Sequence, residues 1–334
     1  MKFLLICIVL ALFNKNEAKT AIFGDGSDLD KVISANSPFI MDRVYYFNRL
    51  ILQSGAQLYS QGYPIFVKDI LSFAVNTSII DRGQDSDGPL GGLGAGQPNI
   101  DCLAERLFSN DSISCPGRIG SLVDLLGGSD GSSHNYNSEG NTGSHLSHHL
   151  DPTSVNSIGL GTIENQFGKG GNGGTSYSPP PESKPFPGSF GGRVSPSGSS
   201  FHSELDFTGV KVSGASGGGA SVHAGGGGGG NIVRIFAKEV YSVGEDFVTV
   251  DVRGGNGADG AGPHGELNSA MPGFSVGGGG SGGGGSVILI TENINVLNPV
   301  KAIVQAGRPG KGYLNGEDGQ TGTSGTFYLR VIKE

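Results

Sequence analysis

The chain has 334 residues, a formal net charge of −8 and an isoelectric point of about 5.4. An acidic balance of this size excludes the extended basic surface with which proteins bind nucleic acids or anionic membranes. Glycine accounts for 62 residues, charged residues make up only 16% and tryptophan is absent. This profile is typical of an all-β or fibrous extracellular protein and not of an average globular enzyme.

Residues 1–18 predict a secretory signal peptide. Lys2 precedes an apolar run, residues 3–13, that is too short to span a bilayer, and Ala18 ends an imperfect small-residue cleavage site. A buried N-terminal strand is the alternative. No later run reaches the roughly 20 apolar residues of a membrane helix. We therefore expect a secreted chain, extracellular or at the cell surface, without a transmembrane anchor.

Residues 19–126 predict an N-terminal β-rich region. Short runs within it carry the apolar and aromatic residues that favour strands: residues 50–52, 58–59, 65–67 and 71–73. Ser54-Gly55 and Gln61-Gly62 separate these runs and predict tight turns. Short strands at such regular spacing fit a parallel β-solenoid, and they equally fit an antiparallel sandwich.

The same region carries the candidate covalent modifications. Cys7 lies in the signal peptide, which leaves Cys102 and Cys115 to form one disulfide in an oxidising compartment, unless both are free thiols. Asn76 and Asn110 each begin an Asn-X-Ser acceptor sequence for N-glycosylation.

Residues 127–200 are rich in Gly, Ser, Asn, His and Pro and predict a low-complexity insertion or linker, because they contain too few apolar groups to offset the entropy of ordering. His145, His148, His149 and Asp151 are residue types that bind zinc or copper. A metal site also needs fixed partners around its ligands, so we predict no metal and no cofactor here.

Residues 201–334 predict a glycine-rich β-repeat region. A hexaglycine, residues 225–230, precedes the apolar run 231–235, and residues 282–285 precede the similar run 286–290. The apolar residues of 247–252 (Phe247, Val248, Val250, Val252) correspond in the same way to Val300, Ala302, Ile303 and Val304. A truncated third copy occupies residues 325–331. An apolar run such as 287–290, with no polar residue, predicts a strand that is covered on both faces.

The glycine blocks have two possible structures. They are flexible linkers, or they are extended polyproline-II-like strands that pack so closely that only glycine fits, as at the axis of collagen. Contact between residues 225–230 and residues 277–285 would indicate the packed layer, whereas separation by solvent would indicate linkers.

The run at residues 47–73, FNRLILQSGAQLYSQGYPIFVKDILSF, resembles the start of glycine-rich, right-handed parallel β-solenoids of secreted and cell-surface proteins. With the glycine blocks followed by IVRIFAKEV and SVILITENI, the resemblance covers residues 43–80 and 201–334. It implies an all-β parallel β-solenoid with glycine-rich loops, in an adhesin or a structural coat protein, and it brings no functional residues with it.

The sequence contains no nucleophile elbow, so we predict no catalytic residue. Glu239, Asp246 and Asp251 alternate with apolar residues and would suit a polysaccharide lyase or glycoside hydrolase if they shared one solenoid face. Aromatic residues near predicted turns would suit stacking on sugars: Tyr45, Tyr46, Tyr59, Tyr63, Phe190, Phe201, Tyr313 and Tyr328. The favoured hypothesis is a secreted non-enzymatic structural or adhesive protein with glycans, extracellular matrix or other copies of itself as partners. A β-helix enzyme on polysaccharide is the alternative.

Overall fold

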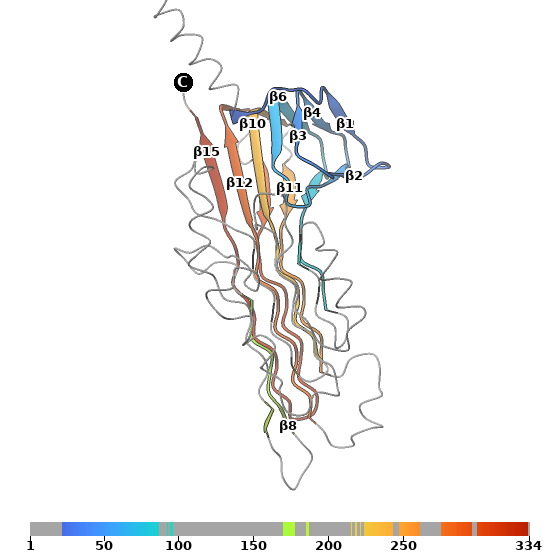
Figure 1. Ribbon diagram of the computed structural model, residues 1–334, viewed down its shortest axis with the longest axis vertical. Helices are drawn as coiled ribbons and strands as arrows, with labels where there is room; N and C mark the ends of the chain where they lie inside the picture. The colour runs from blue at the N-terminus through green and yellow to red at the C-terminus, as the bar shows by residue number, and fades with distance from the viewer. Residues whose placement is uncertain are drawn as a thin grey trace, which may run out of the picture.

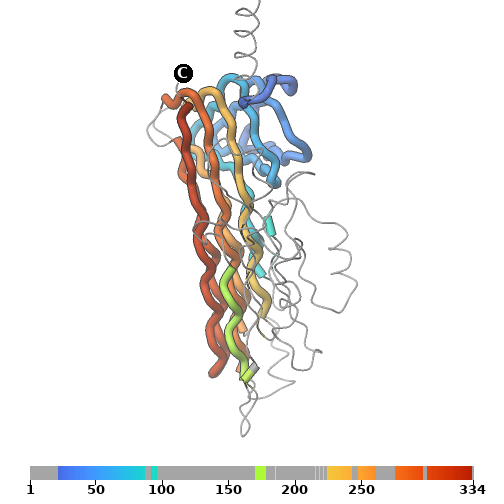
Figure 2. Tube along the Cα trace, turned by 60° about the vertical axis from the view of Figure 1, so that its left-hand side comes forward, coloured from blue at the N-terminus to red at the C-terminus, as the bar shows by residue number. Residues whose placement is uncertain are grey.

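The computed structural model describes the following residues: 22–86, 92, 94–95, 170–177, 185–186, 215, 218, 221, 224–242, 247–260, 275–295 and 299–332. The predicted signal peptide lies outside them. The described part is an elongated all-β body, with two parallel sheets at one end and long extended segments running side by side to the other end (Figures 1 and 2). No helix in this part of the chain is long and apolar enough to cross a membrane.

The larger sheet has eight strands. Its main path runs through β1 (Lys31–Ile33), β4 (Leu50–Leu52), β6 (Ile65–Phe73), β10 (Ile232–Ser242), β12 (Ser286–Thr291) and β15 (Phe327–Val331). Two short strands complete it: β3 (Tyr45–Phe47) pairs with β6, and β13 (Asn293–Ile294) pairs with β10.

The smaller sheet has five strands, in the order β14 (Val300–Ile303), β11 (Val248–Asp251), β7 (Ser78–Ile80), β5 (Gln57–Tyr59) and β2 (Phe39–Ile40). A separate pair joins β8 (Ser176–Tyr177) to β9 (Pro185–Phe186) in antiparallel orientation. Every strand pair within the two larger sheets is parallel. The prediction of an all-β parallel fold is therefore confirmed, and the antiparallel sandwich is wrong.

The chain alternates between the two sheets as it proceeds. It passes from β1 to β2, from β4 to β5, from β6 to β7, from β10 to β11 and from β12 to β14. The tight turns predicted at Ser54-Gly55 and Gln61-Gly62 allow the chain to pass between the sheets. Gly55 and Gly62 both have positive φ there, 73° and 81°. Strand β10 pairs with β6, so strands from both predicted β-rich regions share one sheet.

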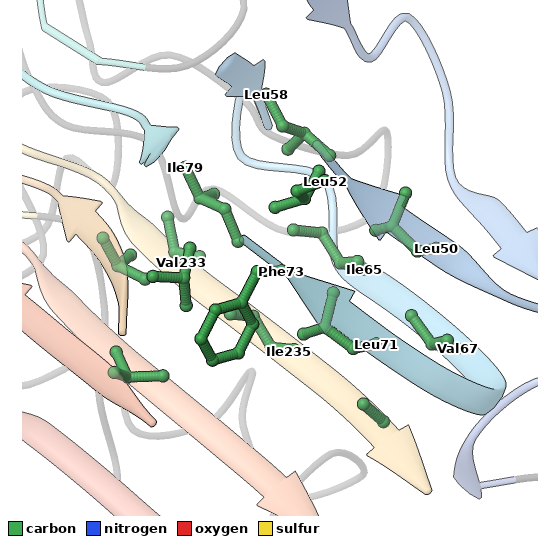
Figure 3. Close-up of a cluster of buried hydrophobic side chains, with 14 of the residues drawn as sticks. Leu50, Leu52, Leu58, Ile65, Val67, Leu71, Phe73, Ile79, Val233 and Ile235 are labelled. Carbon is green, nitrogen blue, oxygen red and sulfur yellow. The ribbon is translucent and has the colours of Figure 1, made fainter. Parts of the chain in front are cut away.

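The core lies between the sheets. Alternate side chains of β4, β6 and β10 point toward Leu58 and Ile79 of the smaller sheet, as Figure 3 shows for the labelled residues. Leu50, Leu71 and Phe73 are completely buried. All residues of β12 are buried as well, which confirms that this strand is covered on both faces.

The register between β10 and β12 differs by one residue from the repeat alignment. Sequence similarity pairs Asn231 with Ser286, whereas in the sheet Ile232 lies beside Ser286 and Val233 beside Val287. The physical reason is the pleat: Val233 and Val287 both belong to the core between the sheets. A shift of one residue would turn one of them to the opposite face.

The outer face of the larger sheet carries an aromatic stack. Tyr46, Phe66 and Phe236 occupy the same register on β3, β6 and β10. Their ring centroids are 5.2 Å apart for Tyr46 and Phe66, and 4.9 Å apart for Phe66 and Phe236. Phe236 also belongs to a second apolar cluster with Ile232 and Ile290. The stack therefore ties the first strands of the chain to the glycine-rich repeats.

Replacing Phe66 with leucine should lower the free energy of unfolding by about 1–2 kcal/mol, because the central ring contributes to two stacked pairs. Tyr46→Leu is the matched control, since Tyr46 stands at the end of the stack and contributes to only one pair. Denaturant unfolding of both variants measures the difference. Equal losses for the two variants would contradict a continuous stack.

Candidate functional site

Extended segments beyond the sheets form what we call the glycine bundle: residues 81–86, 170–177, 224–231, 252–260, 275–285 and 304–325. The N–H of Gly227 donates to the carbonyl of Gly280, and that of Gly230 to Gly283, both at 3.0 Å. The hexaglycine thus lies beside the second glycine block, which is the contact expected of a packed layer. Residues 170–177, from within the stretch predicted to be a linker, also lie in the bundle, because Gly171 donates to Ser281 at 2.9 Å.

Hydrogen bonds in the bundle recur every three residues. Gly254, Gly257 and Gly260 donate to the carbonyls of residues 305, 308 and 311, at 3.1, 2.9 and 2.8 Å. The intervening Gly255 and Ala258 donate instead to a different segment, at residues 228 and 225. Successive residues therefore face different neighbours, and only one residue in three remains free to carry an outward side chain.

At many of its glycines the bundle has no room for a side chain. A Cβ added to Gly227 would lie 2.0 Å from the carbonyl oxygen of Gly255. One added to Gly255 would lie 1.8 Å from the oxygen of Gln84, and one added to Gly285 would lie 1.8 Å from the oxygen of Asn231. The obstacles are backbone atoms of hydrogen-bonded neighbours, which cannot rotate away. Close contact between segments is thus the reason for glycine at these positions.

A buried polar cluster joins the bundle to the sheets. Asp81 is only 6% exposed, and its Oδ2 accepts hydrogen bonds from the Ser60 hydroxyl at 2.8 Å, the Gly62 N–H at 2.5 Å and the Asn231 side-chain amide at 2.9 Å. The N–H of Asn231 also donates to the carbonyl of Asp81 at 3.1 Å. Ser60 and Gly62 follow β5, whereas Asn231 ends the hexaglycine segment, so this one carboxylate links early and late parts of the chain.

Glu317 attaches segment 170–177 to the rest of the bundle. Its Oε2 accepts a hydrogen bond from the Thr175 N–H, and its Oε1 accepts one from the Tyr177 hydroxyl, both at 3.3 Å. Hydrogen bonds from the Thr175 side chain and backbone, with a smaller effect of Tyr177, hold the pKa of Glu317 below its ordinary value of 4.5.

The sign of this shift predicts a pH dependence. Because the folded pKa lies below the unfolded one, Glu317 stabilises the fold above pH 4.5, and this contribution is lost as the pH falls through the folded value. An NMR titration of the Glu317 carboxyl should give a midpoint below 4.5 in the folded protein and near 4.5 in urea. Thr175→Val should move the folded midpoint upward. A folded midpoint at or above the value in urea would contradict the bonding described.

A polar groove of about 620 Å³ lies along the bundle where it leaves the smaller sheet. Its lining comes from three neighbouring segments: Arg82, Gly83, Gln84 and Asp85, then Arg253, Gly254 and Asn256, then Gln305, Ala306, Gly307 and Arg308. Nothing in the sequence analysis singled out these residues. Their trace in the sequence is the spacing of three in Arg253-Asn256-Asp259 and in Gln305-Arg308-Lys311.

The structure separates the residues proposed for catalysis. Glu239 lies on β10 in the larger sheet, whereas Asp251 ends β11 in the smaller sheet. Asp251 is buried and accepts two hydrogen bonds from the Arg253 guanidinium, at 2.9 and 2.7 Å. Asp246 lies outside the described residues. The described carboxylates of this set therefore do not form a pair on one face.

Of the described aromatic residues proposed for sugar stacking, only Tyr63 is buried, Tyr46 is exposed, and the others are partly exposed. Tyr45 stacks on Phe47 with centroids 5.4 Å apart, and Tyr63 is only 8% exposed. Tyr46 belongs to the aromatic stack, Tyr59 donates from its hydroxyl to Gln57, and Tyr328 packs on the second apolar cluster. The backbone of Tyr313 forms a β-bridge with Val276. Phe190 and Phe201 lie outside the described residues.

Of the candidate sites for covalent modification, only Asn76 lies within the described residues. Asn76 is exposed in the turn between β6 and β7, with a positive φ of 58°, so its side chain is accessible. Cys102, Cys115 and Asn110 lie outside the described residues, and the disulfide and the second glycosylation site stay predictions. The described residues contain no group of His, Cys, Asp and Glu that could hold a metal ion; His145, His148, His149 and Asp151 are not among them.

No protein-family model matches the chain, and neither a curated protein nor a solved structure matches it. The resemblance to secreted β-solenoid proteins therefore stays a prediction, and the function has to be inferred from the geometry.

Proposed function

We propose that the chain is a secreted, non-enzymatic protein of a cell surface, matrix or coat, with a structural or adhesive role. The observation that carries this proposal is the glycine bundle, in which backbones pack with no space for a Cβ at positions such as Gly227 and Gly255. Such a body stays extended and rigid without a large apolar core. It suits a rigid spacer that presents one end of the molecule to a partner.

In this proposal the two parallel sheets are the faces of a β-solenoid, because the chain visits them alternately and always in parallel. The bundle segments are polyproline-II-like strands. Their hydrogen bonds recur every three residues, and polyproline II has three residues per turn and no hydrogen bonds within a strand. The N–H and C=O groups of such a strand are all available for hydrogen bonds to neighbouring segments.

The test separates the adhesive role from the enzymatic alternative. Purified full-length protein is applied to a panel of immobilised polysaccharides and matrix proteins, and both retention and release of reducing ends are measured. Retention on at least one surface without reducing ends is expected. Release of reducing ends would overturn the proposal in favour of a polysaccharide-cleaving enzyme, and failure to be retained on any surface would overturn the adhesive role.

Secretion predicts modification of Asn76. When the chain is expressed in a secreting eukaryotic cell, treatment with an N-glycosidase should increase its electrophoretic mobility. Asn76→Gln should reduce this mobility shift by the contribution of one glycan, because Asn76 lies in an exposed turn that is accessible to the transferase. Asn110→Gln is tested in parallel. A mobility that neither the glycosidase nor Asn76→Gln alters would contradict glycosylation at Asn76.

A further inference from the structure

Most of the side chains that line the groove lie in two rows. Arg82, Arg253 and Gln305 lie side by side on neighbouring segments, since the Gly83 N–H donates to the Arg253 carbonyl at 2.9 Å and the Gly254 N–H to the Gln305 carbonyl at 3.1 Å. This forms the first row across three segments of the bundle.

The second row lies three residues further along each segment. Asp85 accepts a hydrogen bond from the Asn256 N–H at 2.8 Å, and the Asn256 side-chain oxygen accepts one from the Arg308 N–H at 2.7 Å. A Cβ added to Gly83 or Gly254 would point into the bundle, 2.0 and 2.1 Å from carbonyl oxygens. Between the rows the groove is therefore bare backbone at Gly83 and Gly254, whereas Gln84 and Ala306 carry side chains there.

The charge of the groove is opposite to that of the chain. Its lining contains three arginines and one aspartate, whereas the whole protein has a net charge of −8. Asp251, just behind the first row, is bonded to Arg253 and lies 4.0 Å from Arg82. These arginines keep side chains that are 59% and 44% exposed, for Arg82 and Arg253 respectively. Even with Asp251 counted, the groove is a local positive site.

The other groups that line the groove indicate the kind of molecule to which a bound anionic group would belong. Gln84, Asn256 and Gln305 supply neutral amides that both donate and accept hydrogen bonds. The groove, at about 620 Å³, is of the size that holds drug-sized ligands and not a lone inorganic anion. Amides that bond hydroxyls beside guanidinium groups that bond an oxyanion match the chemistry of an acidic sugar.

We propose that this groove binds an acidic saccharide, with a sulfate or carboxylate group on its arginines and sugar hydroxyls on the amides. The proposal deepens the adhesive role inferred above, because it names the class of ligand. A sulfate and a carboxylate both present oxyanion oxygens that a guanidinium binds through paired hydrogen bonds, and the test therefore includes both.

The experiment is titration calorimetry on the full chain with a sulfated disaccharide, a uronate-containing disaccharide, their neutral parent and inorganic sulfate. At least one acidic disaccharide should bind, and more tightly than the neutral parent or sulfate alone. Arg82→Gln and Arg308→Gln should each weaken this binding about tenfold or more, which corresponds to one lost charged hydrogen bond. Arg330→Gln, on exposed β15 in the larger sheet, is the matched control and should bind as the parent protein does.

Equal binding by the groove variants and the parent protein would overturn the proposal, as would no binding of either acidic disaccharide. Inorganic sulfate binding as tightly as the disaccharides would show an anion site and overturn the saccharide assignment. Retention of Arg82→Gln on the surfaces used to test adhesion would distinguish failure of the groove proposal from failure of the adhesive role. In that case the adhesive role would stand without the groove.

Discussion

Replacing Gly255 with alanine is expected to lower the free energy of unfolding by about 3 kcal/mol or more. Its N–H donates to Gly228 at 2.7 Å, and its carbonyl accepts from Gly282 at 2.9 Å, so three segments meet at this residue. The new Cβ would lie 1.8 Å from the Gln84 oxygen. Overpacking costs about 1–3 kcal/mol where side chains can adjust, and here hydrogen-bonded backbone has to move. Thermal unfolding should show a melting temperature lower by about 6–12 °C.

The matched control lies in the same segment. Ala258 already carries a Cβ and is only 9% exposed, so Ala258→Gly also changes one methyl group in the bundle. It should cost about 1 kcal/mol or less, mainly through the greater freedom of the unfolded chain. Gly227→Ala, within the hexaglycine, should behave like Gly255→Ala. Alanine variants that melt with the parent protein would mean that the segments are not packed as described.

Asp81→Ala is expected to lower the free energy of unfolding by about 3–5 kcal/mol. The substitution removes the acceptor of three buried donors, on Ser60, Gly62 and Asn231. Each buried donor left without a partner costs about 1–3 kcal/mol, and partial rearrangement reduces the sum. Denaturant unfolding measures the loss. The effect should extend to the bundle, because Asn231 lies where the hexaglycine segment enters β10.

Two further variants identify the cause. Asp81→Asn keeps one acceptor oxygen and the same volume, so it should cost less than Asp81→Ala. Asp259→Ala removes an exposed carboxylate that accepts from the Lys311 N–H at 2.7 Å. It should change the stability by less than about 1 kcal/mol, because water can replace it. If Asp81→Ala behaved like Asp259→Ala, the buried cluster would not be a stabilising link.

The parallel β architecture was expected from the resemblance, and contact between the glycine blocks was one of the two structures that the sequence left open. Runs such as residues 287–290 have no polar side chain to expose, and glycine blocks have none to bury. The register of the repeats was off by one residue because similarity aligned Asn231 with Ser286, whereas the pleat aligns Val233 with Val287. Sequence similarity does not record which face of a strand is buried.

The groove could not be predicted in the same way. Arg82, Arg253 and Arg308 are far apart in the chain, and they come together only because three bundle segments lie in register. The three-residue spacing of polar side chains was visible in the sequence, but its meaning depends on a structure with three residues per turn. The aromatic residues show a related limit of the sequence, since position near a turn does not show whether a ring is buried, like Tyr63, or exposed, like Tyr46.

Amide hydrogen exchange of the glycines is the most direct test of a bundle held together by its own backbone. The N–H groups of Gly227, Gly230, Gly255 and Gly282 all donate to carbonyls of neighbouring segments. NMR exchange should show them protected to a degree comparable with strand residues such as Val287. Exchange of these glycines at the rate of an unstructured peptide, with Val287 still protected, would contradict the account.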